Sequence, residues 1–330
     1  MDRKLNIGLY GSAGHQIGVK DYENETCIAA VCAVSDGFKK ALEENGNGGF
    51  KVYETLEEML ADEEIDLISL CSPQRSEQEE DAIRCLNAGK HVYAEKPAAF
   101  TEEGLERILS AAKEAGKEFH EMADSVYTEP YWSVRKAVRG GKVGEVVQVY
   151  VQKSYPLNVD TRPQNEEKDG GLIRQAGIHA IRFLEHITGL WVKDVKVIET
   201  HLGNINPNEG LFTASSWMME LSNGGVASAC INYLNPKGFG KWGNESVRIF
   251  GTQGMIEITD GGRHTHLYTS DSDAGEVDTS SSDCKDFFLQ IVRHLKYGEK
   301  LPMSIENELH PLRTVIKAFN SATVTKVNSI

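Results

Sequence analysis

Short apolar runs alternate with amphipathic segments along the first third of the chain. The apolar runs have the length of strands and occur at Leu5–Tyr10, Thr26–Val34, Leu67–Cys71 and His91–Ala94. The intervening segments carry helix patterns, and strands that are apolar on both faces are typical of a parallel sheet covered by helices on both sides. The pattern predicts an α/β domain that extends to about residue 123.

Polar residues and glycines indicate where two of these helices begin and end. Ser76 followed three residues later by Glu79 matches a capping box, and Gly89 follows Ala88 in a position that commonly ends a helix. Thr101 precedes two glutamates, which suit the positive end of the next helix. We therefore expect one helix to end near Ala88 and the next to begin near Thr101.

The pattern changes after about residue 123. Glu145–Lys153 alternates like a half-buried strand, and Leu172–Thr188 has the length of one long helix. Several strand-like runs then follow one another without intervening helices, which favours an antiparallel or mixed sheet. These runs are Val192–His201, Thr213–Leu221, Val226–Asn232, Val247–Phe250 and Met255–Ile258. The sequence thus predicts a first domain over residues 1–123 and a second over 124–330, which two helices close.

Composition narrows the class of protein. The 330 residues are 40% hydrophobic and 25% charged, as in ordinary globular proteins. The net charge of −14 argues against sequence-independent binding of nucleic acid, although a local basic pocket could still bind a negatively charged small ligand. No apolar run approaches the ~20 residues needed to span a bilayer, so we expect no membrane contact and a cytoplasmic location. Six cysteines without a CxxC pair favour reduced core thiols over a zinc site, and we expect no metal.

Three strand ends carry candidate ligand residues, because an open parallel sheet binds ligands outside the carboxyl ends of its strands. In the loop from Gly11 to Gln16, only Gly11 matches the register of a dinucleotide fingerprint, and Gly14 adds backbone freedom. Amides at the start of a following helix would hold a pyrophosphate, and the alternative is a plain glycine-rich turn. Asp36 follows the second strand, where it would bind a ribose or cap the next helix. The candidate cofactor residues are Gly11, Ser12, Ala13, Gly14, His15, Gln16 and Asp36, with the turn Cys71, Ser72 and Pro73, which would otherwise serve only as a turn.

The segment "HVYAEKPA" at 91–98 ends an apolar strand with an acid and an amine. Glu95 and Lys96 follow the strand directly, and Pro97 then fixes the next φ angle. Glycine and polar residues are sufficient to end a strand, so strand termination alone does not explain Glu95 and Lys96. We interpret the segment as one that presents Lys96 at the rim of a ligand site.

The predicted long helix carries one polar stripe. Gln175, His179, Arg182 and His186 fall at i, i+4, i+7 and i+11 on an otherwise apolar helix. A solvated face is the simpler interpretation of such a stripe, and a ligand-binding face is the alternative.

The order of these segments resembles the Gfo/Idh/MocA family, which takes its name from glucose–fructose oxidoreductase, inositol dehydrogenase and rhizopine catabolism. Successive motifs similar to that family are "IDLISLCSP", "CLNAGKHVYAEKPAA", "VRGGKVGEV", "GGLIRQAGIH" and "VRIFGTQGMIEI", which together cover nearly the whole chain. The Glu-Lys-Pro segment is highly specific, whereas the glycine loop is not. The resemblance implies an α/β protein with an N-terminal Rossmann dinucleotide-binding domain, followed by an α+β domain with a mixed, mostly antiparallel sheet. It also implies assembly into homodimers or homotetramers.

The resemblance further implies the roles of individual residues. Lys96 would reach the reacting oxygen, His179 would act as general acid/base, and Gln175 would orient the imidazole. Glu95 and Lys96 would also line the cofactor site. The chemistry agrees, because alcohol oxidation needs a hydride acceptor, a base for the hydroxyl proton and a cation near the oxygen. A histidine titrates near neutrality and suits the proton transfer.

The sequence departs from the family pattern at several positions. Gln175 and Arg182 stand where many members carry aspartates on the helix of His179. Val34 stands where NAD-using members often have their ribose acid, which leaves Asp36 two residues further on. Glu77 stands where a histidine is common. These departures leave the predicted fold intact and concern residues expected at the cofactor and substrate sites.

We therefore expect an NAD- or NADP-dependent oxidoreductase acting at a secondary alcohol or ketone of a sugar, polyol or sugar-acid-like small molecule. A carboxylate at Asp36 would repel a 2′-phosphate and favours NAD, whereas Lys39 and Lys40 argue the other way. One rival is a lyase- or glycosidase-like enzyme that uses tightly bound NAD for transient oxidation. The other is a sensor that binds a nucleotide or a sugar without catalysis.

Several basic residues suggest an anionic sugar derivative as substrate. Arg174 and Arg182 would join Lys96 in a locally positive site on an acidic protein. The alternative is that Arg182 pairs with Glu185 or Glu145 and never meets the ligand. The expected substrate contacts are Lys96, Lys153, Tyr155, Arg174, His179 and Arg182.

Overall fold

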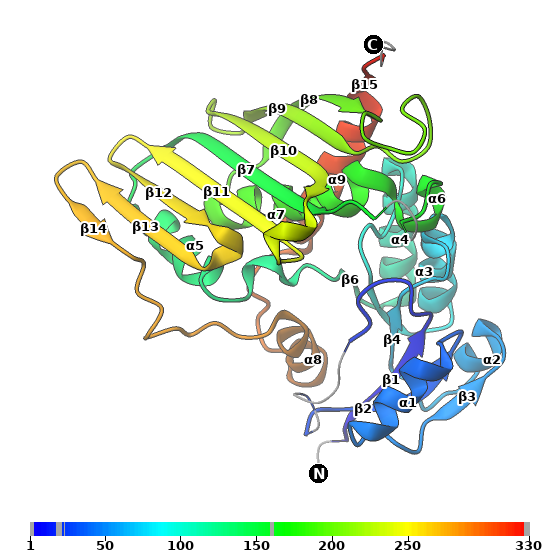
Figure 1. Cartoon of the computed structure of the whole chain (residues 1–330). Coiled ribbons are helices and arrows are strands. Elements are labelled where there is room, and N and C mark those ends of the chain that lie inside the picture. Colours follow the sequence, from blue (N-terminus) through cyan, green and yellow to red (C-terminus); the bar gives the residue numbers. More distant parts are fainter. Residues whose placement is uncertain (1–2, 18–21, 23, 159–161, 327–330) are drawn as a thin grey trace. The chain divides into compact units, whose positions relative to one another are not determined.

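The computed structural model describes residues 3–17, 22, 24–158 and 162–326, which form two compact units (Figure 1). The first unit comprises Met1–Met122, Glu167–Asp169 and Phe287–Glu308. The second comprises Ala123–Glu166, Gly170–Asp286 and Leu309–Ile330. None of the helices in the described ranges has the length and apolar content that crossing a bilayer would require.

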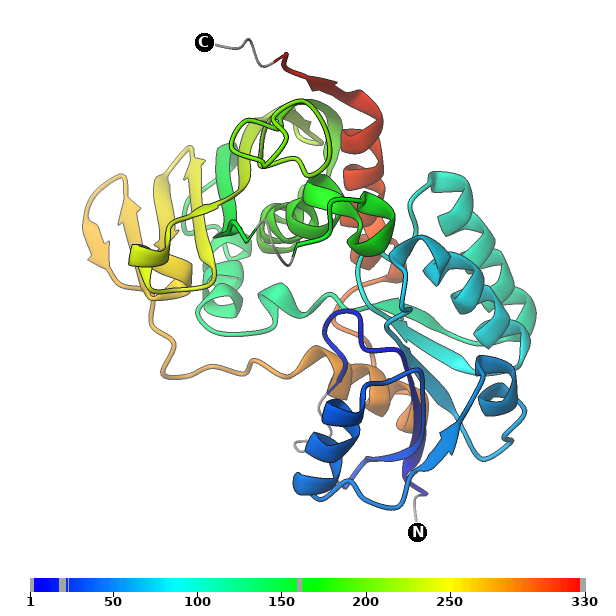
Figure 2. The same cartoon turned by 45° about the vertical axis from the view of Figure 1, so that its right-hand side comes forward.

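The first unit is built on a six-stranded sheet in the order β3-β2-β1-β4-β5-β6, in which every neighbouring pair is parallel. The strands are β1 (Leu5–Tyr10), β2 (Thr26–Cys32), β3 (Lys51–Tyr53), β4 (Leu67–Leu70), β5 (His91–Ala94) and β6 (Phe119–Glu121). The helices that follow them are α1 (Asp36–Glu44), α2 (Leu56–Leu60), α3 (Gln78–Asn87) and α4 (Glu102–Ala115). Helices cover both faces (Figure 2), and Ile7, Leu9 and Ile68 are fully buried between the layers. The strand order reverses between β1 and β4, so the predicted doubly wound domain is confirmed.

The predicted capping box before α3 is wrong, although the other helix ends are confirmed. The chain first makes a 3₁₀ turn at Arg75–Glu77, so Ser76 lies inside that turn and makes no capping bond to α3. Glu79 instead pairs with Arg107 of α4 at 2.7 Å. Gly89 adopts φ 75° just after α3, and Thr101 caps α4 as expected.

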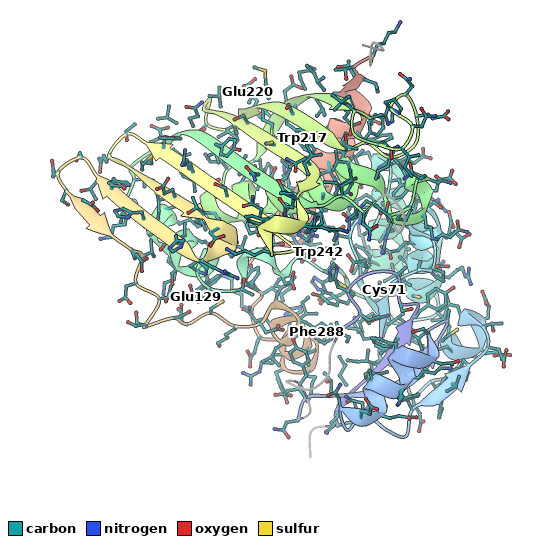
Figure 3. The ribbon with its side chains drawn as sticks, viewed as in Figure 1. Cys71, Glu129, Trp217, Glu220, Trp242 and Phe288 are labelled. Atoms are coloured by element: carbon teal, nitrogen blue, oxygen red, sulfur yellow. The ribbon has the colours of Figure 1, made fainter. Side chains whose placement is uncertain are left out.

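The first unit also contains helix α8 (Phe287–Tyr297) and the first residues of helix α9 (Ile305–Ser321). The Phe288 ring lies 4.8 Å from Tyr93 and 5.3 Å from Tyr22 between ring centroids, which packs α8 onto the parallel sheet (Figure 3). The expected second domain over residues 124–330 therefore differs from the second unit. The reason is that these apolar contacts place α8 with the first sheet.

The second unit is built on a nine-stranded sheet in the order β14-β13-β12-β11-β7-β10-β9-β8-β15. The strands are β7 (Val146–Pro156), β8 (Val192–Thr200), β9 (Ala214–Leu221), β10 (Val226–Asn235), β11 (Asn244–Gly251), β12 (Gly254–Thr259), β13 (His264–Thr269), β14 (Asp273–Gly275) and β15 (Ala322–Val324). β7 runs parallel to β10 and β15 to β8, and the other pairs are antiparallel, which confirms the mixed, mostly antiparallel sheet. Helices α5 (Tyr131–Arg139) and α7 (Ile178–Thr188) lie on one face of it (Figure 1).

The predicted long helix is divided into two parts. Residues Leu172–Gly177 form a π-helical segment, and α7 continues from Ile178 to Thr188. A Cβ on Gly177 would lie 2.7 Å from Trp217 of β9, so this glycine lets the helix approach the sheet closely. The expected stripe does not form one solvated face. Arg182 and His186 are buried in the core of the unit.

Candidate functional site

The glycine loop at the end of β1 lies at the switch point between β1 and β4. Gly11 has φ 71°, and a Cβ there would come within 2.0 Å of the Cys71 carbonyl oxygen. The Gly11 N–H donates to the Cys32 carbonyl at 2.9 Å, so the loop is held against the ends of β2 and β4. Only glycine fits at this position, which suits the tight turn made by the first glycine of a dinucleotide loop.

Gln16 fixes the loop to the strands beneath it. Its side-chain amide donates to the carbonyls of Tyr10, Gly11 and Ser69 at 3.0–3.1 Å. Its oxygen accepts from the Ser69 hydroxyl at 2.7 Å. The side chain at the third fingerprint position is therefore used to shape the loop. The beginning of the helix that was expected to follow, residues 18–21, lies outside the described residues.

Glu95 joins the glycine loop to the segment that carries Lys96. Its Oε2 accepts from the backbone N–H of His15 at 2.6 Å and lies 3.1 Å from the His15 ring. Its Oε1 accepts from the Lys96 N–H at 3.0 Å and lies 3.9 Å from Lys96 Nζ. Burial alone would raise the pKa of Glu95, but the His15 contact and the charges of Lys96 and Arg75 outweigh it and lower the pKa to about 2. Glu95 is thus an ionised carboxylate inside the protein, with both oxygens in use.

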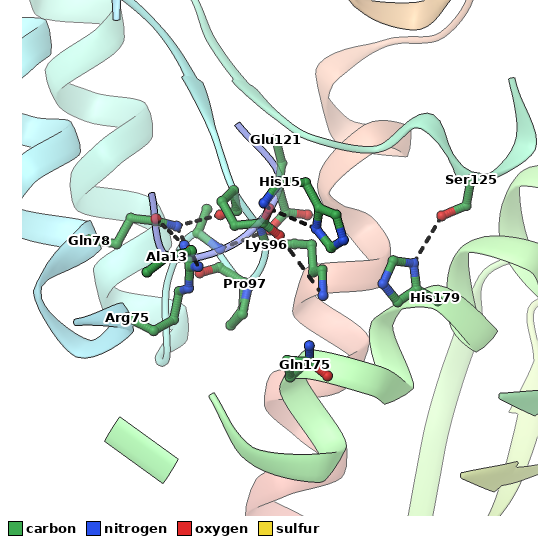
Figure 4. A network of polar contacts seen from close by, with 12 residues as sticks. Ala13, His15, Arg75, Gln78, Lys96, Pro97, Glu121, Ser125, Gln175 and His179 are labelled. Atoms are coloured by element: carbon green, nitrogen blue, oxygen red, sulfur yellow. Dashed lines mark hydrogen bonds and ion pairs between the residues drawn. The ribbon is translucent and has the colours of Figure 1, made fainter. Parts of the chain in front are cut away.

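Arg75 and Gln78 form a second link between the same two segments (Figure 4). Arg75 donates to the Ala13 carbonyl of the glycine loop and to the Gln78 side-chain oxygen. The Gln78 amide in turn donates to the carbonyls of Glu95 and, at 3.1 Å, Pro97. Both side chains are buried, at 5% and 0% exposure. We call this set the Arg75–Gln78 relay. Neither residue was among the predicted site residues, because the spacing of two polar residues at a helix start does not indicate which carbonyls they reach.

The two other predicted strand-end sites differ in character. Cys71 is buried, and Ser72 donates to Asp81 at 2.7 Å, so this turn is fixed from within the protein. Asp36 is the first residue of α1, and its carboxylate lies 2.6 Å from Lys39 with 96% of the side chain exposed. Ser35, not Asp36, caps the helix, because its hydroxyl accepts from the Phe38 N–H. The capping alternative for Asp36 is therefore wrong, and its role toward a ribose stays a prediction.

The second unit carries the predicted proton-transfer residue. The His179 Nδ1 lies 3.1 Å from the hydroxyl of Ser125, which belongs to the short 3₁₀ helix Asp124–Val126 (Figure 4). Ser125 was not considered in the sequence analysis, and it fixes the orientation of the ring. Gln175, expected to orient the imidazole, accepts from the Tyr233 hydroxyl at 3.4 Å. The catalytic assignments of His179 and Gln175 stay predictions.

Lys153 and Tyr155 lie together near the end of β7. Lys153 is buried and pairs with Glu245, which lies opposite it on β11. The Lys153 Nζ also lies 4.7 Å from the centroid of the Tyr155 ring. Burial lowers the pKa of Lys153, whereas Glu245 acts in the opposite direction. The Tyr155 ring lies 5.9 Å from Trp242, which is 63% exposed (Figure 3). The arrangement supplies an aromatic surface beside a cation whose charge is already balanced.

The two arginines proposed as substrate contacts lie in the interior of the second unit. The Arg174 guanidinium lies 3.4 Å from the centroid of the Phe319 ring, and burial lowers its pKa while Glu166 and Glu199 act in the opposite direction. Arg182 is fully buried. Their roles as substrate contacts stay predictions.

The first unit fits a dinucleotide. The loop at the switch point has two glycines, Gly11 and Gly14, whose missing Cβ atoms let the loop pack closely against Cys71 and Glu95. Such a loop in a doubly wound sheet suits the pyrophosphate of a nicotinamide dinucleotide. Among the described residues, no group of three histidine, cysteine or acidic side chains could hold a metal ion, and the six cysteines are free thiols.

Two family models match the chain in succession. The model described as "Oxidoreductase family, NAD-binding Rossmann fold" matches residues 5–122, and the "GFO/IDH/MocA C-terminal domain" matches residues 131–257. Among characterised relatives, the myo-inositol 2-dehydrogenase of Thermotoga maritima is 24% identical over 310 residues, which cover 92% of this chain and 88% of that protein. The D-glucoside 3-dehydrogenase of Escherichia coli is 28% identical over 188 residues, and the match spans about half of both chains, 54% and 50%.

Solved structures agree with the family models. An oxidoreductase from Thermotoga maritima superposes with a TM-score of 0.84 at 28% identity, covering 96% of this chain and 97% of that one. The WlbA dehydrogenase from Chromobacterium violaceum, solved with NADH and UDP-GlcNAcA, superposes with a TM-score of 0.80 at 19% identity over 97% and 94% of the two chains. The second match shows the fold alone. Both units are thus accounted for by one family, and the chain belongs to the Gfo/Idh/MocA family of NAD-binding oxidoreductases.

Proposed function

We propose that the protein transfers hydride between a nicotinamide cofactor and a secondary alcohol or ketone of a sugar or polyol. The observation that carries the proposal is the placement of Lys96. β5 delivers it to the carboxyl edge of the sheet, and Glu95 holds it to the glycine loop through contacts on both sides. A buried cation fixed beside a cofactor loop suits stabilisation of negative charge on a substrate oxygen.

His179 would supply the proton transfer. In the oxidative direction it takes the hydroxyl proton while Lys96 polarises the oxygen, and a bound nicotinamide supplies the hydride acceptor. The Ser125 hydroxyl can donate to the imidazole Nδ1 or accept from it, so it orients the ring in either tautomer. This suits a group that must act as a base in one direction and as an acid in the other.

The charge partners favour a neutral polyhydroxylated substrate over an anionic one. Lys153 is balanced by Glu245, Arg182 is fully buried, and the Arg174 charge is influenced by Glu166 and Glu199. Tyr155 and Trp242 offer the aromatic surface beside the lysine. The named activities of the relatives, an inositol 2-dehydrogenase and a glucoside 3-dehydrogenase, support the same substrate class. Stronger binding of uronates or sugar phosphates than of neutral sugars would contradict this choice.

We propose NAD as the preferred cofactor. Asp36 follows β2 and is exposed, so its carboxylate would repel a 2′-phosphate, although Lys39 partly offsets its charge. The proposal predicts tighter binding of NAD than of NADP in a direct titration. Asp36→Ala should reduce the difference between the affinities for NAD and NADP. Glu44→Ala, at the other end of α1, is the matched control and should leave this difference unchanged.

The central experiment combines a substrate panel with Lys96→Ala. NAD(P)H formation should be found with at least one sugar or polyol, and Lys96→Ala should lower turnover about 100-fold, as expected for loss of one charge-stabilising donor. The Kd for the cofactor should change far less. Near-wild-type turnover in the variant would assign Lys96 a structural role. Substrate conversion without net NAD(P)H formation would instead indicate transient oxidation by a tightly bound cofactor.

We also propose that the outer face of the nine-stranded sheet binds a second copy of the chain. This face, opposite α5 and α7, exposes Ile198, Met218, Val226 and Phe250. Exposed apolar groups on neighbouring strands are typical of subunit interfaces. Met218→Glu should convert a dimer or tetramer to a smaller species in light scattering, whereas Val52→Glu on β3 should not. A monomeric wild-type protein would contradict the proposal.

A further inference from the structure

A cavity lies at the opposite edge of the parallel sheet from the glycine loop. It has a volume of about 380 Å³ and is lined by residues at the amino ends of three strands: Leu5 of β1, Asp66 before β4, and His91 of β5. Lys117, in the segment between α4 and β6, and Lys296, near the end of α8, complete the lining. The cavity lies entirely within the first unit and has no place in the proposed hydride transfer.

The lining of this cavity is basic, in contrast to the acidic protein around it. It contains five cationic side chains and two carboxylates, whereas the chain as a whole has a net charge of −14. The cations are Arg3, Lys4, Lys90, Lys117 and Lys296, and the carboxylates are Glu63 and Asp66. A local excess of positive charge in a concave site attracts anions even when the net charge is negative.

Only some of this charge is neutralised within the protein. Arg3 pairs with Asp66 at 2.5 Å, and Asp66 also accepts from the Asn6 N–H at 2.8 Å. Lys296 pairs with Glu25 at 2.7 Å. Within the described ranges, Lys4 and Lys117 form no ion pair. These two lysines are therefore the charges that a ligand would meet.

Lys90 is a buried residue of the cavity lining. It is only 5% exposed, and its Nζ donates to the carbonyls of Asp62 at 2.7 Å and Ile65 at 2.9 Å. An ammonium group has three N–H donors, so these two contacts hold the group in place and leave one donor. Burial lowers the pKa of Lys90, and Lys117 acts in the same direction against the nearby Asp62 and Asp66.

His91 adds a neutral donor to the same wall. Its Nδ1 accepts from the Glu118 N–H at 3.1 Å, so the proton of the neutral ring is on Nε2. Burial and then the charge of Lys117 lower the pKa of His91 to about 4. Lys117 thus acts against the charged forms of both Lys90 and His91. An anion placed among the three would offset this repulsion.

From this geometry we propose that the cavity binds the phosphate group of a small phosphorylated ligand through Lys4, Lys90 and Lys117. Phosphate oxygens accept several charge-assisted hydrogen bonds at once, and three lysines of this lining carry ammonium donors. The volume falls within the range of small-molecule sites, so it has room for more than a single ion. Binding here would occur at a place distinct from the cofactor loop, and it requires no chemical step.

The test is calorimetric titration of the full chain with inorganic phosphate, pyrophosphate and ADP, with and without saturating NAD. Binding should persist when NAD is present, because the cavity is at the other edge of the sheet. Pyrophosphate or ADP binding tighter than phosphate would identify a larger ligand. Equal binding of all three would identify the phosphate group alone as the recognised part.

Lys117→Gln and, independently, Lys4→Gln should each weaken binding about tenfold or more, the range for one charge-assisted hydrogen bond. Lys113→Gln is the matched control, since Lys113 is an exposed lysine in the last turn of α4 outside the cavity. Circular dichroism checks that each variant is folded. The proposal is overturned if none of the three ions binds at about 10 mM, if NAD abolishes binding, or if the Lys117 and Lys4 variants bind like the Lys113 control.

Discussion

The Oε2 atom of Glu95 lies 2.6 Å from the backbone nitrogen of His15, so a carboxylate at the end of β5 holds the loop at the end of β1. The other oxygen of the same carboxylate accepts from the Lys96 N–H. One buried charge therefore fixes both the loop that suits the cofactor and the lysine that we assign to the substrate oxygen. Displacement of either segment must disturb the other.

Gly14 is the residue that makes this contact possible. It has φ 129°, and a Cβ there would come within 2.7 Å of Glu95 Oε2. Gly14→Ala should therefore push the loop away from Glu95, weaken NAD binding about tenfold, and destabilise the fold by about 1–3 kcal/mol. Cofactor titration and urea unfolding measure the two effects.

Gly37→Ala is the control for this substitution. Gly37 lies in the first turn of α1, and a Cβ there would meet nothing within 4 Å. That variant should bind NAD like the wild type. If Gly14→Ala also binds NAD normally, the Glu95 contact does not shape the cofactor loop.

The sequence predicted the parts of the fold that depend on pattern. The alternation of apolar strands and helices was sufficient for the six-stranded parallel sheet, and the later run of strands was sufficient for the mixed one. The placement of α8 could not be predicted in this way, because it depends on the contact between Phe288 and Tyr93, which are distant in sequence. The π segment before α7 depends on the approach of Gly177 to Trp217, which no periodic pattern contains.

The candidate site was predicted unevenly for the same reason. Motifs indicated Lys96 and His179 as candidate catalytic residues, and their catalytic roles stay predictions. Ser125, Arg75 and Gln78 were missed, since each acts through a contact with a residue distant in sequence. The positive substrate site expected from Arg174 and Arg182 stays a prediction, and the burial of both side chains could not be read from the order of charges along the helix.

Ser125 provides a test of the role of His179. Its hydroxyl contacts the imidazole Nδ1 without carrying charge. In Ser125→Asp, a carboxylate would stabilise the imidazolium, so the acidic limb of the pH–rate profile for oxidation should move to higher pH. Ser125→Ala should lower turnover about 10-fold or more through loss of orientation, within the range for an acid–base group. Unchanged profiles in both variants would mean that His179 is not the base, and Ser133→Ala on α5 serves as a control.

The charged cluster around His120 predicts a specific dependence of stability on pH. His120 is buried, and its two ring nitrogens contact Glu308 at 2.9 Å and Glu118 at 3.0 Å. His294 also contacts Glu118, at 2.9 Å. Burial alone would lower the pKa of His120, but Glu308 and Glu118 raise it from 6.5 to about 9. Because the folded protein holds the proton more tightly than the unfolded chain, this stabilisation is complete below pH 6.5 and is lost as the pH rises through about 9.

Chemical unfolding at a series of pH values between these limits measures the effect. The free energy of unfolding should fall by about 1–3 kcal/mol from the acidic to the alkaline end. His120→Gln should flatten the curve, whereas His264→Gln, at an exposed position of β13, should reproduce the wild-type dependence. A wild-type curve that rises with pH over this range would contradict the assignment of a charged His120.

The Arg75–Gln78 relay should couple cofactor binding to the position of Lys96. Arg75 reaches the carbonyl of Ala13, and Gln78 reaches the carbonyls of Glu95 and Pro97 on either side of Lys96. Arg75→Met should weaken NAD binding and also lower turnover, although the hydrogen bonds of Arg75 go to Ala13 of the loop and to Gln78. Gln78→Met should lower turnover and also weaken NAD binding, although Gln78 contacts no residue of the glycine loop directly. Because the two side chains act as one unit, the double variant should lose less than the sum of the single losses, with a coupling energy of about 1–3 kcal/mol in both Kd and turnover. Gln74→Met is the matched control, since Gln74 lies next to Arg75 and donates only to the exposed Glu77. Additive losses in the double variant would mean that Arg75 and Gln78 stabilise their own segments separately, and that the loop and Lys96 are joined through Glu95 alone.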